Sequence, residues 1–183
     1  MPHTRRWATA AAAVVSIGWP GFSLAATLNV PADYPTIQAC IDATVSDVDE
    51  CVAAPGTYHE TINFLGKAIT LRSSGGADVT TIDATGLKGS VVRCVSDEGP
   101  DTVLDGFTIT GGTFSGMYNY SSSPTVTDCT FSGNTGYNGG GMYNRFKSSP
   151  TVSGCTFNAN TAPSSLFEGG AGGGMYNEDS SPI

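Results

Sequence analysis

Basic side chains are scarce in this chain. It contains 8 Lys and Arg residues against 16 Asp and Glu residues, and its formal net charge is −8 at pH 7. Nucleic acids and anionic lipids attract clusters of basic residues, which this composition does not supply. We therefore expect no nucleic-acid partner.

Histidine is nearly absent, and the motifs that accompany it in common active sites are missing. Only His59 lies outside the first 25 residues, beside Glu60. A zinc site needs Cys and His residues clustered at short spacings, and the sequence has no such cluster. A Ser-His-Asp triad would have to use His59, but no Gly-x-Ser-x-Gly motif is present. We predict no metal ligand and no catalytic residue, and interpret His59 as a solvated loop residue.

Long apolar runs are also lacking, apart from one near the N-terminus. Residues 7–19 form an Ala- and Val-rich run after Arg5 and Arg6, and small residues follow at positions 23–25. This layout is typical of a secretory signal peptide. A membrane anchor is the alternative, but the run is too short to span a bilayer comfortably. We predict a signal peptide at residues 1–25, no membrane span after its cleavage, and a mature chain that is secreted, periplasmic or on the cell surface.

The chain is instead rich in repetition. Residues 117–141 read MYNYSSSPTVTDCTFSGNTGYNGGG, residues 142–174 read MYNRFKSSPTVSGCTFNANTAPSSLFEGGAGGG, and a third copy opens at Met175. A period of about 20–50 residues is typical of stacked-repeat proteins. The Thr-, Val- and Phe-rich segments favour strands, and the Gly runs and Ser-Ser-Pro favour turns. A Leu-rich solenoid is excluded because the units lack its regularly spaced leucines.

Strands this short cannot bury an apolar face alone. Stacking the copies lets each strand pair in parallel with its copy about 4.8 Å away. The sequence therefore predicts an all-β fold, a parallel β-helix, in one domain. Matching apolar positions, mostly 22 residues apart, predict three inward columns. These are Ile82, Leu104, Val126 and Val152; Phe107, Cys129 and Cys155; and Ile109, Phe131 and Phe157.

The segment after residue 25 begins with a different pattern. Ile37, Cys40, Ile41 and Thr44 share one face of a short helix, which would cover the end of the core. We expect residues 26–65 to form this capping helix and the first strands, and residues 66–183 to form the coils. Because the third copy stops in mid-repeat, we expect a C-terminally incomplete β-helix, continued by further coils or a C-terminal domain.

The chain has five cysteines, an odd number, so at least one has no partner within it. Cys40 and Cys51 lie across a predicted helix-to-strand connection and could form a disulfide in an oxidising compartment. Cys129 and Cys155 occupy equivalent repeat positions and should stack in the core. We interpret these two as buried thiols that act as small hydrophobic groups rather than as a bonded pair.

Several segments resemble known families. TIQACIDAT, VAAPGTYHETINF, AITLRS and TVLDGFTITGG look like the N-terminal half of secreted right-handed parallel β-helix proteins of the pectin-lyase-like superfamily. The GGGMYN, FSGN and FNAN elements resemble repeats of polymorphic outer-membrane proteins. The resemblance covers nearly all of residues 29–183 and implies a right-handed β-helix. That fold carries lyases, hydrolases, esterases and adhesins alike, so it implies no single activity.

Motifs of the degrading relatives are missing. The Asn-Thr-Asp, Gly-His-Gly and Arg-Ile-Lys motifs of polygalacturonases do not occur, and the catalytic Gln and Asp blocks of pectin methylesterases have no match. These absences argue against catalysis within residues 26–183. They leave open a site in sequence further along.

Asp83 and Asp105 form a candidate carboxylate pair. They follow Ile82 and Leu104, so the predicted stacking places them about 4.8 Å apart on neighbouring coils. Two close carboxylates could hold Ca²⁺ or share a proton. The alternative, which we favour, is that each is a corner Asp bonded to its own backbone two residues on. We therefore expect no cofactor, with Ca²⁺ as the only candidate.

Tyr118, Tyr143 and Tyr176 each follow a methionine in the repeat. If Met points inward, Tyr points outward, and three stacked tyrosines would form an exposed stripe for sugar rings. The alternative is that the rings stack only to stabilise the column. Columns of asparagine are interpreted as structural ladders at corners. They are Asn119, Asn144 and Asn177, and Asn134 and Asn160.

Together these features predict an exported or cell-surface scaffold that is non-catalytic and contacts a polysaccharide or cell-surface glycan, as an adhesin does. A polysaccharide lyase or another carbohydrate-active enzyme is the alternative. A spacer domain without a ligand is the third interpretation.

Overall fold

The computed structural model describes residues 25–45, 47–163 and 172–183, so the predicted signal peptide lies outside it except for its last residue. The described residues form one helix and three sheets of parallel strands. Sheet A contains β1 (Thr27–Val30), β2 (Glu50–Ala53), β5 (Thr70–Ser73), β8 (Val103–Asp105), β11 (Thr125–Thr127) and β14 (Thr151–Ser153). Sheet B contains β3 (Gly56–Tyr58), β6 (Thr80–Asp83), β9 (Thr108–Thr110), β12 (Thr130–Ser132) and β15 (Thr156–Asn158). Sheet C contains β4 (Ile62–Asn63), β7 (Ser90–Cys94), β10 (Ser115–Tyr120), β13 (Met142–Arg145) and β16 (Met175–Glu178).

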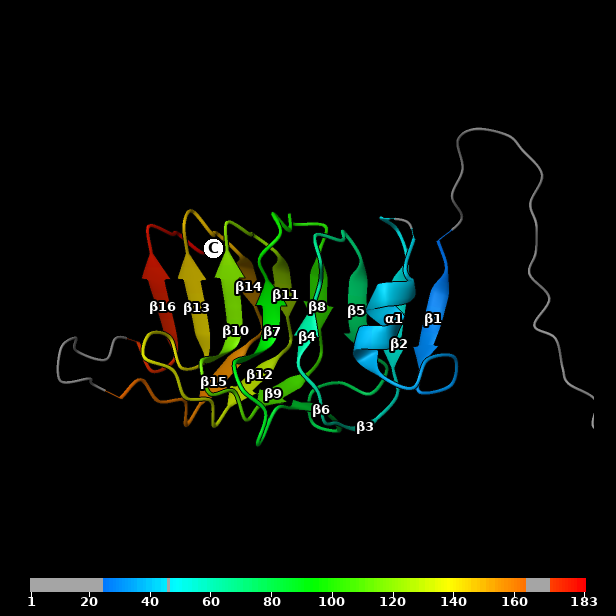
Figure 1. Cartoon of the computed structure of the whole chain (residues 1–183), viewed down its shortest axis with the longest axis horizontal. Helices are drawn as coiled ribbons and strands as arrows, with labels where there is room; N and C mark the ends of the chain where they lie inside the picture. Colours follow the sequence, from blue (N-terminus) through cyan, green and yellow to red (C-terminus); the bar gives the residue numbers. More distant parts are fainter. Residues whose placement is uncertain (1–24, 46, 164–171) are drawn as a thin grey trace, which may run out of the picture.

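The chain visits the three sheets in turn. Each coil contributes one strand to sheet A, one to sheet B and one to sheet C, and each strand pairs in parallel with the strand one coil away. Figure 1 shows the result as an elongated stack, with β16, β13, β10 and β7 side by side along one wall. The predicted all-β parallel β-helix is confirmed.

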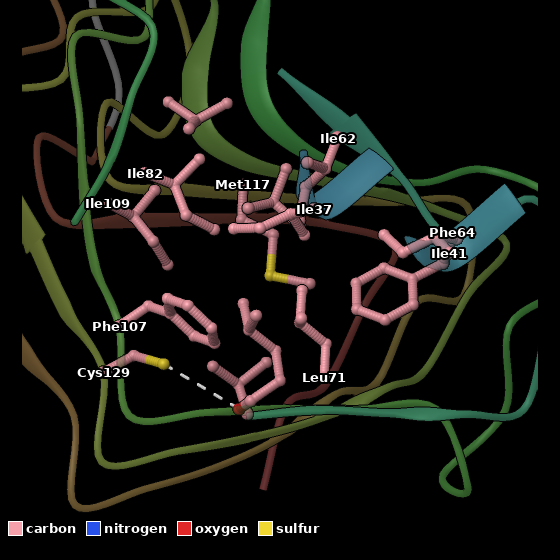
Figure 2. Packing of buried hydrophobic residues seen from close by; sticks show 14 of the residues in the cluster. Ile37, Ile41, Ile62, Phe64, Leu71, Ile82, Phe107, Ile109, Met117 and Cys129 are labelled. Carbon is pink, nitrogen blue, oxygen red and sulfur yellow. Dashed lines mark hydrogen bonds between the residues drawn. The ribbon is translucent and has the colours of Figure 1, made fainter. Parts of the chain in front are cut away.

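The strand register contains two of the predicted core columns. They are Ile109, Phe131 and Phe157 on sheet B, and Leu104, Val126 and Val152 on sheet A. The placement of Ile82 beneath Leu104 is wrong. Ile82 pairs with Ile109 on sheet B, and the two lie next to each other in Figure 2. Leu71 is the residue that pairs with Leu104 on sheet A. The 22-residue spacing misled because the step from Leu71 to Leu104 is 33 residues (104 − 71), and Ile82 belongs to sheet B whereas Leu104 belongs to sheet A.

The same register separates the predicted carboxylate pair. Asp83 pairs with Thr110 on sheet B, whereas Asp105 lies between Arg72 and Thr127 on sheet A. The two aspartates therefore do not stack on neighbouring coils, and the interpretation of Asp83 and Asp105 as one site is incorrect.

A continuous apolar core fills the space between the three sheets (Figure 2). Its largest fully buried side chains include Phe64, Phe107 and Phe131. Most of the core-facing positions alternate with outward ones along each strand, as the period of two requires. Phe131 stacks on Phe157 with ring centroids 4.9 Å apart and planes tilted by 7°.

The helix α1 (Ile37–Ala43) lies beside β1 and β2 at the opposite end of the stack from β16 (Figure 1). Its buried face consists of Ile37, Cys40 and Ile41, as expected, and it packs against β1, β2 and β4. The carboxylate of Glu60 accepts hydrogen bonds from the first backbone amides of the helix, and Lys67 donates to carbonyl oxygens at its last turn. These partners satisfy backbone groups that a helix leaves free at both ends.

Cys40 and Cys51 are joined in a disulfide whose Cα atoms are 6.1 Å apart. The bond links α1 to β2 across a sequence separation of 11. It therefore tethers the capping helix to the first complete coil.

Candidate functional site

The outward face of sheet C carries a column of aligned polar and aromatic side chains. Tyr118 pairs with Arg93 on one side and with Tyr143 on the other, and Tyr143 pairs with Tyr176. The preceding methionines Met117 and Met142 are fully buried. Because side chains alternate along a strand, the tyrosines point away from the core.

The rings of this column contact one another. The centroids of Tyr118 and Tyr143 are 5.4 Å apart, and those of Tyr143 and Tyr176 are 5.6 Å apart. Two phenylalanines from the turns that flank the strands join the group. The ring of Phe114 meets Tyr118 edge-on at 5.3 Å, and that of Phe146 lies 5.0 Å from Tyr120. We call these six residues the aromatic strip: Phe114, Tyr118, Tyr120, Tyr143, Phe146 and Tyr176.

Exposure within the aromatic strip differs from the sequence prediction. Tyr143 is only 5% exposed, so the three tyrosines do not form the evenly exposed stripe that the sequence predicted. Its ring is covered because rings on adjacent rungs overlap and Phe114 also lies against it, with centroids 6.1 Å apart. The most exposed rings are Phe114 at 40% and Phe146 at 51%, which sequence reasoning did not single out. Both lie in turns beside the strands of sheet C, where the alternation of inward and outward residues does not apply, so the sequence pattern does not indicate their exposure.

Polar contacts hold the far end of the aromatic strip. The hydroxyl of Tyr143 donates to Oε2 of Glu178, and Nε of Arg145 donates to Oε1 of the same carboxylate over 3.2 Å. Burial and the neighbouring Glu178 raise the pKa of Tyr143 to about 12, so its hydroxyl stays protonated at neutral pH. The guanidinium of Arg145 also lies over the ring of Phe146, 5.6 Å from its centroid. These contacts fix the rings in one arrangement.

The candidate carboxylates have separate local partners. Oδ1 of Asp83 accepts a hydrogen bond from the backbone amide of Thr85 over 2.8 Å, and its bonding to Thr85 lowers the pKa of Asp83. This is the corner interaction, two residues on, that the sequence favoured. Asp105 accepts from the hydroxyl of Thr127 over 2.6 Å. In the described ranges no three His, Cys, Asp or Glu side chains converge to hold a metal ion.

The asparagine columns form hydrogen-bonded ladders. Nδ2 of Asn119 donates to Oδ1 of Asn144, and Nδ2 of Asn144 donates to Oδ1 of Asn177, both over 2.8 Å. Asn119 and Asn144 are fully buried inside sheet C, so this ladder runs through the strands rather than along a corner. A second ladder, in which Asn134 donates to Asn160, lies just after β12, at the turn where a corner was expected.

The architecture agrees with a comparison to known families. A family model described as the right-handed β-helix region matches residues 58–182. The chain belongs to the right-handed β-helix family. No curated protein and no solved structure matches the chain. Membership is consistent with the pectin-lyase-like resemblance, whereas the likeness to outer-membrane-protein repeats stays a prediction.

Membership of the right-handed β-helix family does not determine the localisation of the protein. In the part of the chain that the structure describes, no helix has the length and apolarity to cross a membrane. The predicted export rests on residues 1–25, nearly all of which lie outside that part.

Two of the three free cysteines of the β-helix lie in contact. Cys129 is buried and Cys155 is half-buried in the next coil. Hydrogen bonding from the Cys129 thiol lowers the pKa of Cys155 to about 7, while the same contact and burial raise the pKa of Cys129. The thiolate is the reactive form of cysteine, so these shifts separate the reactivities of the two residues.

We expect iodoacetamide to modify Cys155 alone in the folded protein. The rate of modification should rise as the pH passes through about 7, because Cys155 becomes a thiolate above its pKa. An unperturbed thiol would ionise at about 8.5. Mass spectrometry of quenched samples measures the rate at each site. Cys155→Ser should abolish labelling until the protein is unfolded, and simultaneous labelling of Cys94 would contradict the assignment.

Proposed function

We propose that this β-helix is an exported, non-catalytic scaffold that contacts a polysaccharide or cell-surface glycan through the aromatic strip. The observation that carries the proposal is the continuous series of ring contacts on the outward face of sheet C, in which Tyr118 and Tyr120, with ring centroids 6.4 Å apart, join the exposed Phe146 to the column. Contiguous exposed apolar area on a folded protein marks a binding surface.

The arrangement suits a sugar chain. Sugar rings have flat C–H faces that pack on aromatic rings, and the rings of the aromatic strip are already held by a parallel sheet. A surface that needs no reordering loses little entropy when it binds. The ring spacings of 5.4 and 5.6 Å repeat along the stack, which favours a ligand that is itself a repeating chain.

Binding is favoured over hydrolysis by the placement of the carboxylates. Most glycosidases need two carboxyl groups on either side of the scissile bond. The carboxylate of Glu178, which contacts the aromatic strip, is occupied by Tyr143 and Arg145. Asp83 and Asp105 belong to the other two sheets.

The test is affinity electrophoresis of the protein through gels that contain xylan, mannan or homogalacturonan. We expect retardation by at least one polysaccharide, and a loss of affinity of about tenfold in the double variant Phe114→Ala/Phe146→Ala. Complete burial of a Phe side chain is worth about 1.5–3 kcal/mol, and partial burial of two exposed rings under a sugar chain would thus exceed the roughly 1.4 kcal/mol that corresponds to tenfold. These two positions are preferred to Tyr143 because they are exposed and their truncation spares the core.

Tyr137→Ala is the matched control, since Tyr137 is 67% exposed but makes no ring contact with the aromatic strip among the described residues. It should retain wild-type retardation. Equal affinity of the wild type and the double variant would remove the aromatic strip from the proposal. Release of unsaturated sugar ends from any of the three polysaccharides would instead establish a lyase.

A further inference from the structure

A hollow of about 250 Å³ opens at the end of the aromatic strip nearest β7. Its lining includes Thr61, Lys88, Gly89, Arg93, Phe114 and Tyr118. Phe114 and Tyr118 therefore belong both to the aromatic strip and to this hollow, which we call the basic hollow. A ligand that lies along the strip would reach it without crossing another surface.

The basic hollow concentrates positive charge in an acidic protein. Only six basic residues follow residue 25, and two of them, Lys88 and Arg93, line it. Arg72 and Arg145 form ion pairs with Glu50 and Glu178. Lys88 and Arg93 are both exposed, and neither forms an ion pair with another residue that the structure describes. Two uncompensated cations in one hollow select a negatively charged group.

Register places one of these cations in line with the rings. Arg93 pairs directly with Tyr118, so its guanidinium starts from the rung next to the tyrosine column. A guanidinium binds carboxylate or sulfate oxygens through two parallel hydrogen bonds. A sugar ring packed on Phe114 and Tyr118 would thus have an anion receptor at its edge.

The volume of the basic hollow and the net charge of the protein limit which ligands it can bind. Drug-sized ligands occupy pockets of about 300–1,000 Å³, so a hollow of about 250 Å³ fits one sugar residue rather than a long segment. The net charge of −8 repels a dense polyanion, including nucleic acid, from the rest of the molecule. An isolated acidic sugar meets the local cations without that repulsion.

We infer that the basic hollow is a subsite for a single acidic sugar, bearing a carboxylate or a sulfate ester, within an otherwise neutral glycan. The inference rests on the proposed glycan binding by the aromatic strip and specifies what that glycan carries. Phe114 and Tyr118 receive the ring, and Arg93 with Lys88 receives the anion.

The test uses three trisaccharides of one backbone whose terminal residue is glucose, glucuronic acid or glucose 6-sulfate. We expect isothermal titration calorimetry to show at least one acidic trisaccharide binding about tenfold more tightly than the neutral one. Arg93→Gln should abolish this preference, so that the acidic trisaccharides bind no more tightly than the neutral one does. Lys147→Gln is the matched control, because Lys147 is an exposed cation outside the hollow, and it should keep the preference. The glucuronic acid and sulfate arms distinguish the two anions.

The outcomes separate this inference from the proposed function. Equal binding of neutral and acidic trisaccharides, with loss on Phe114→Ala, would overturn the acidic subsite and keep the aromatic strip. An equal loss in Arg93→Gln and Lys147→Gln, or tighter binding of a trisaccharide with three acidic residues than of those with one, would overturn it in favour of general charge attraction. Absence of binding to every trisaccharide and polysaccharide would overturn both proposals.

Discussion

Replacing Phe131 with alanine is expected to lower the free energy of unfolding by about 3–5 kcal/mol. The side chain is fully buried, pairs in register with Ile109 and stacks on Phe157 at 4.9 Å. Its removal leaves a cavity between rigid strands that cannot close around it, so the lost packing adds to the lost burial. Urea denaturation followed by circular dichroism measures the change.

Phe157→Ala is the control for this prediction. Phe157 occupies the same column one coil further on, but it is only partly buried. Its truncation removes the same number of atoms with less loss of buried area, so the destabilisation should be less than half as large. Equal effects at the two positions would show that stacking between the rings, and not burial, dominates the column.

Asn144→Leu is expected to destabilise the protein by about 2–4 kcal/mol, although it replaces a polar core residue with an apolar one of similar size. The substitution removes the acceptor of Asn119 Nδ2 and the donor to Asn177 Oδ1. A buried polar group that loses its partner costs about 1–3 kcal/mol. Asn119 is especially sensitive because its Oδ1 is buried without a hydrogen bond among the described residues.

The matched variant is Asn177→Leu, at the exposed end of the same ladder. It breaks one hydrogen bond instead of two, and water can replace the missing partner, so we expect a loss of about 1 kcal/mol or less. Thermal unfolding monitored by circular dichroism compares the two. Greater stability of Asn144→Leu than of the wild type would contradict a stabilising ladder.

The parts of the fold that were predictable are those in which the sequence repeats itself. The two MYN units place Val126 beside Val152 and Phe131 beside Phe157, and identical letters in a stacked repeat specify the register. The capping helix was equally visible, because its apolar residues follow the helical period. Where repeat identity fades, the letters no longer specify the register, and Ile82 was placed next to Leu104, a position that Leu71 occupies.

Other features could not be predicted from the sequence because they depend on how the turns place residues from different coils. The strands β1 (Thr27–Val30) and β3 (Gly56–Tyr58) lie within the range expected for the first strands, but their bounds were not predicted because both are short and neither shares the letters of the repeat. The burial of Tyr143 depends on where the turn before β10 places Phe114. The basic hollow joins Lys88 and Arg93 to that same turn, and no periodic pattern links them in the sequence.

The in-register pairing of Met117, Met142 and Met175, with the tyrosines beside them, has an evolutionary consequence. Contacts in a solenoid are made mainly between adjacent coils, so an internal duplication in the gene inserts a new coil without disturbing the others. Every duplicated unit would lengthen the ring-bearing wall and leave its cross-section unchanged. If the wall binds glycan as proposed, its affinity for long polymers would change with the number of copies, through avidity, before any contact residue had to mutate.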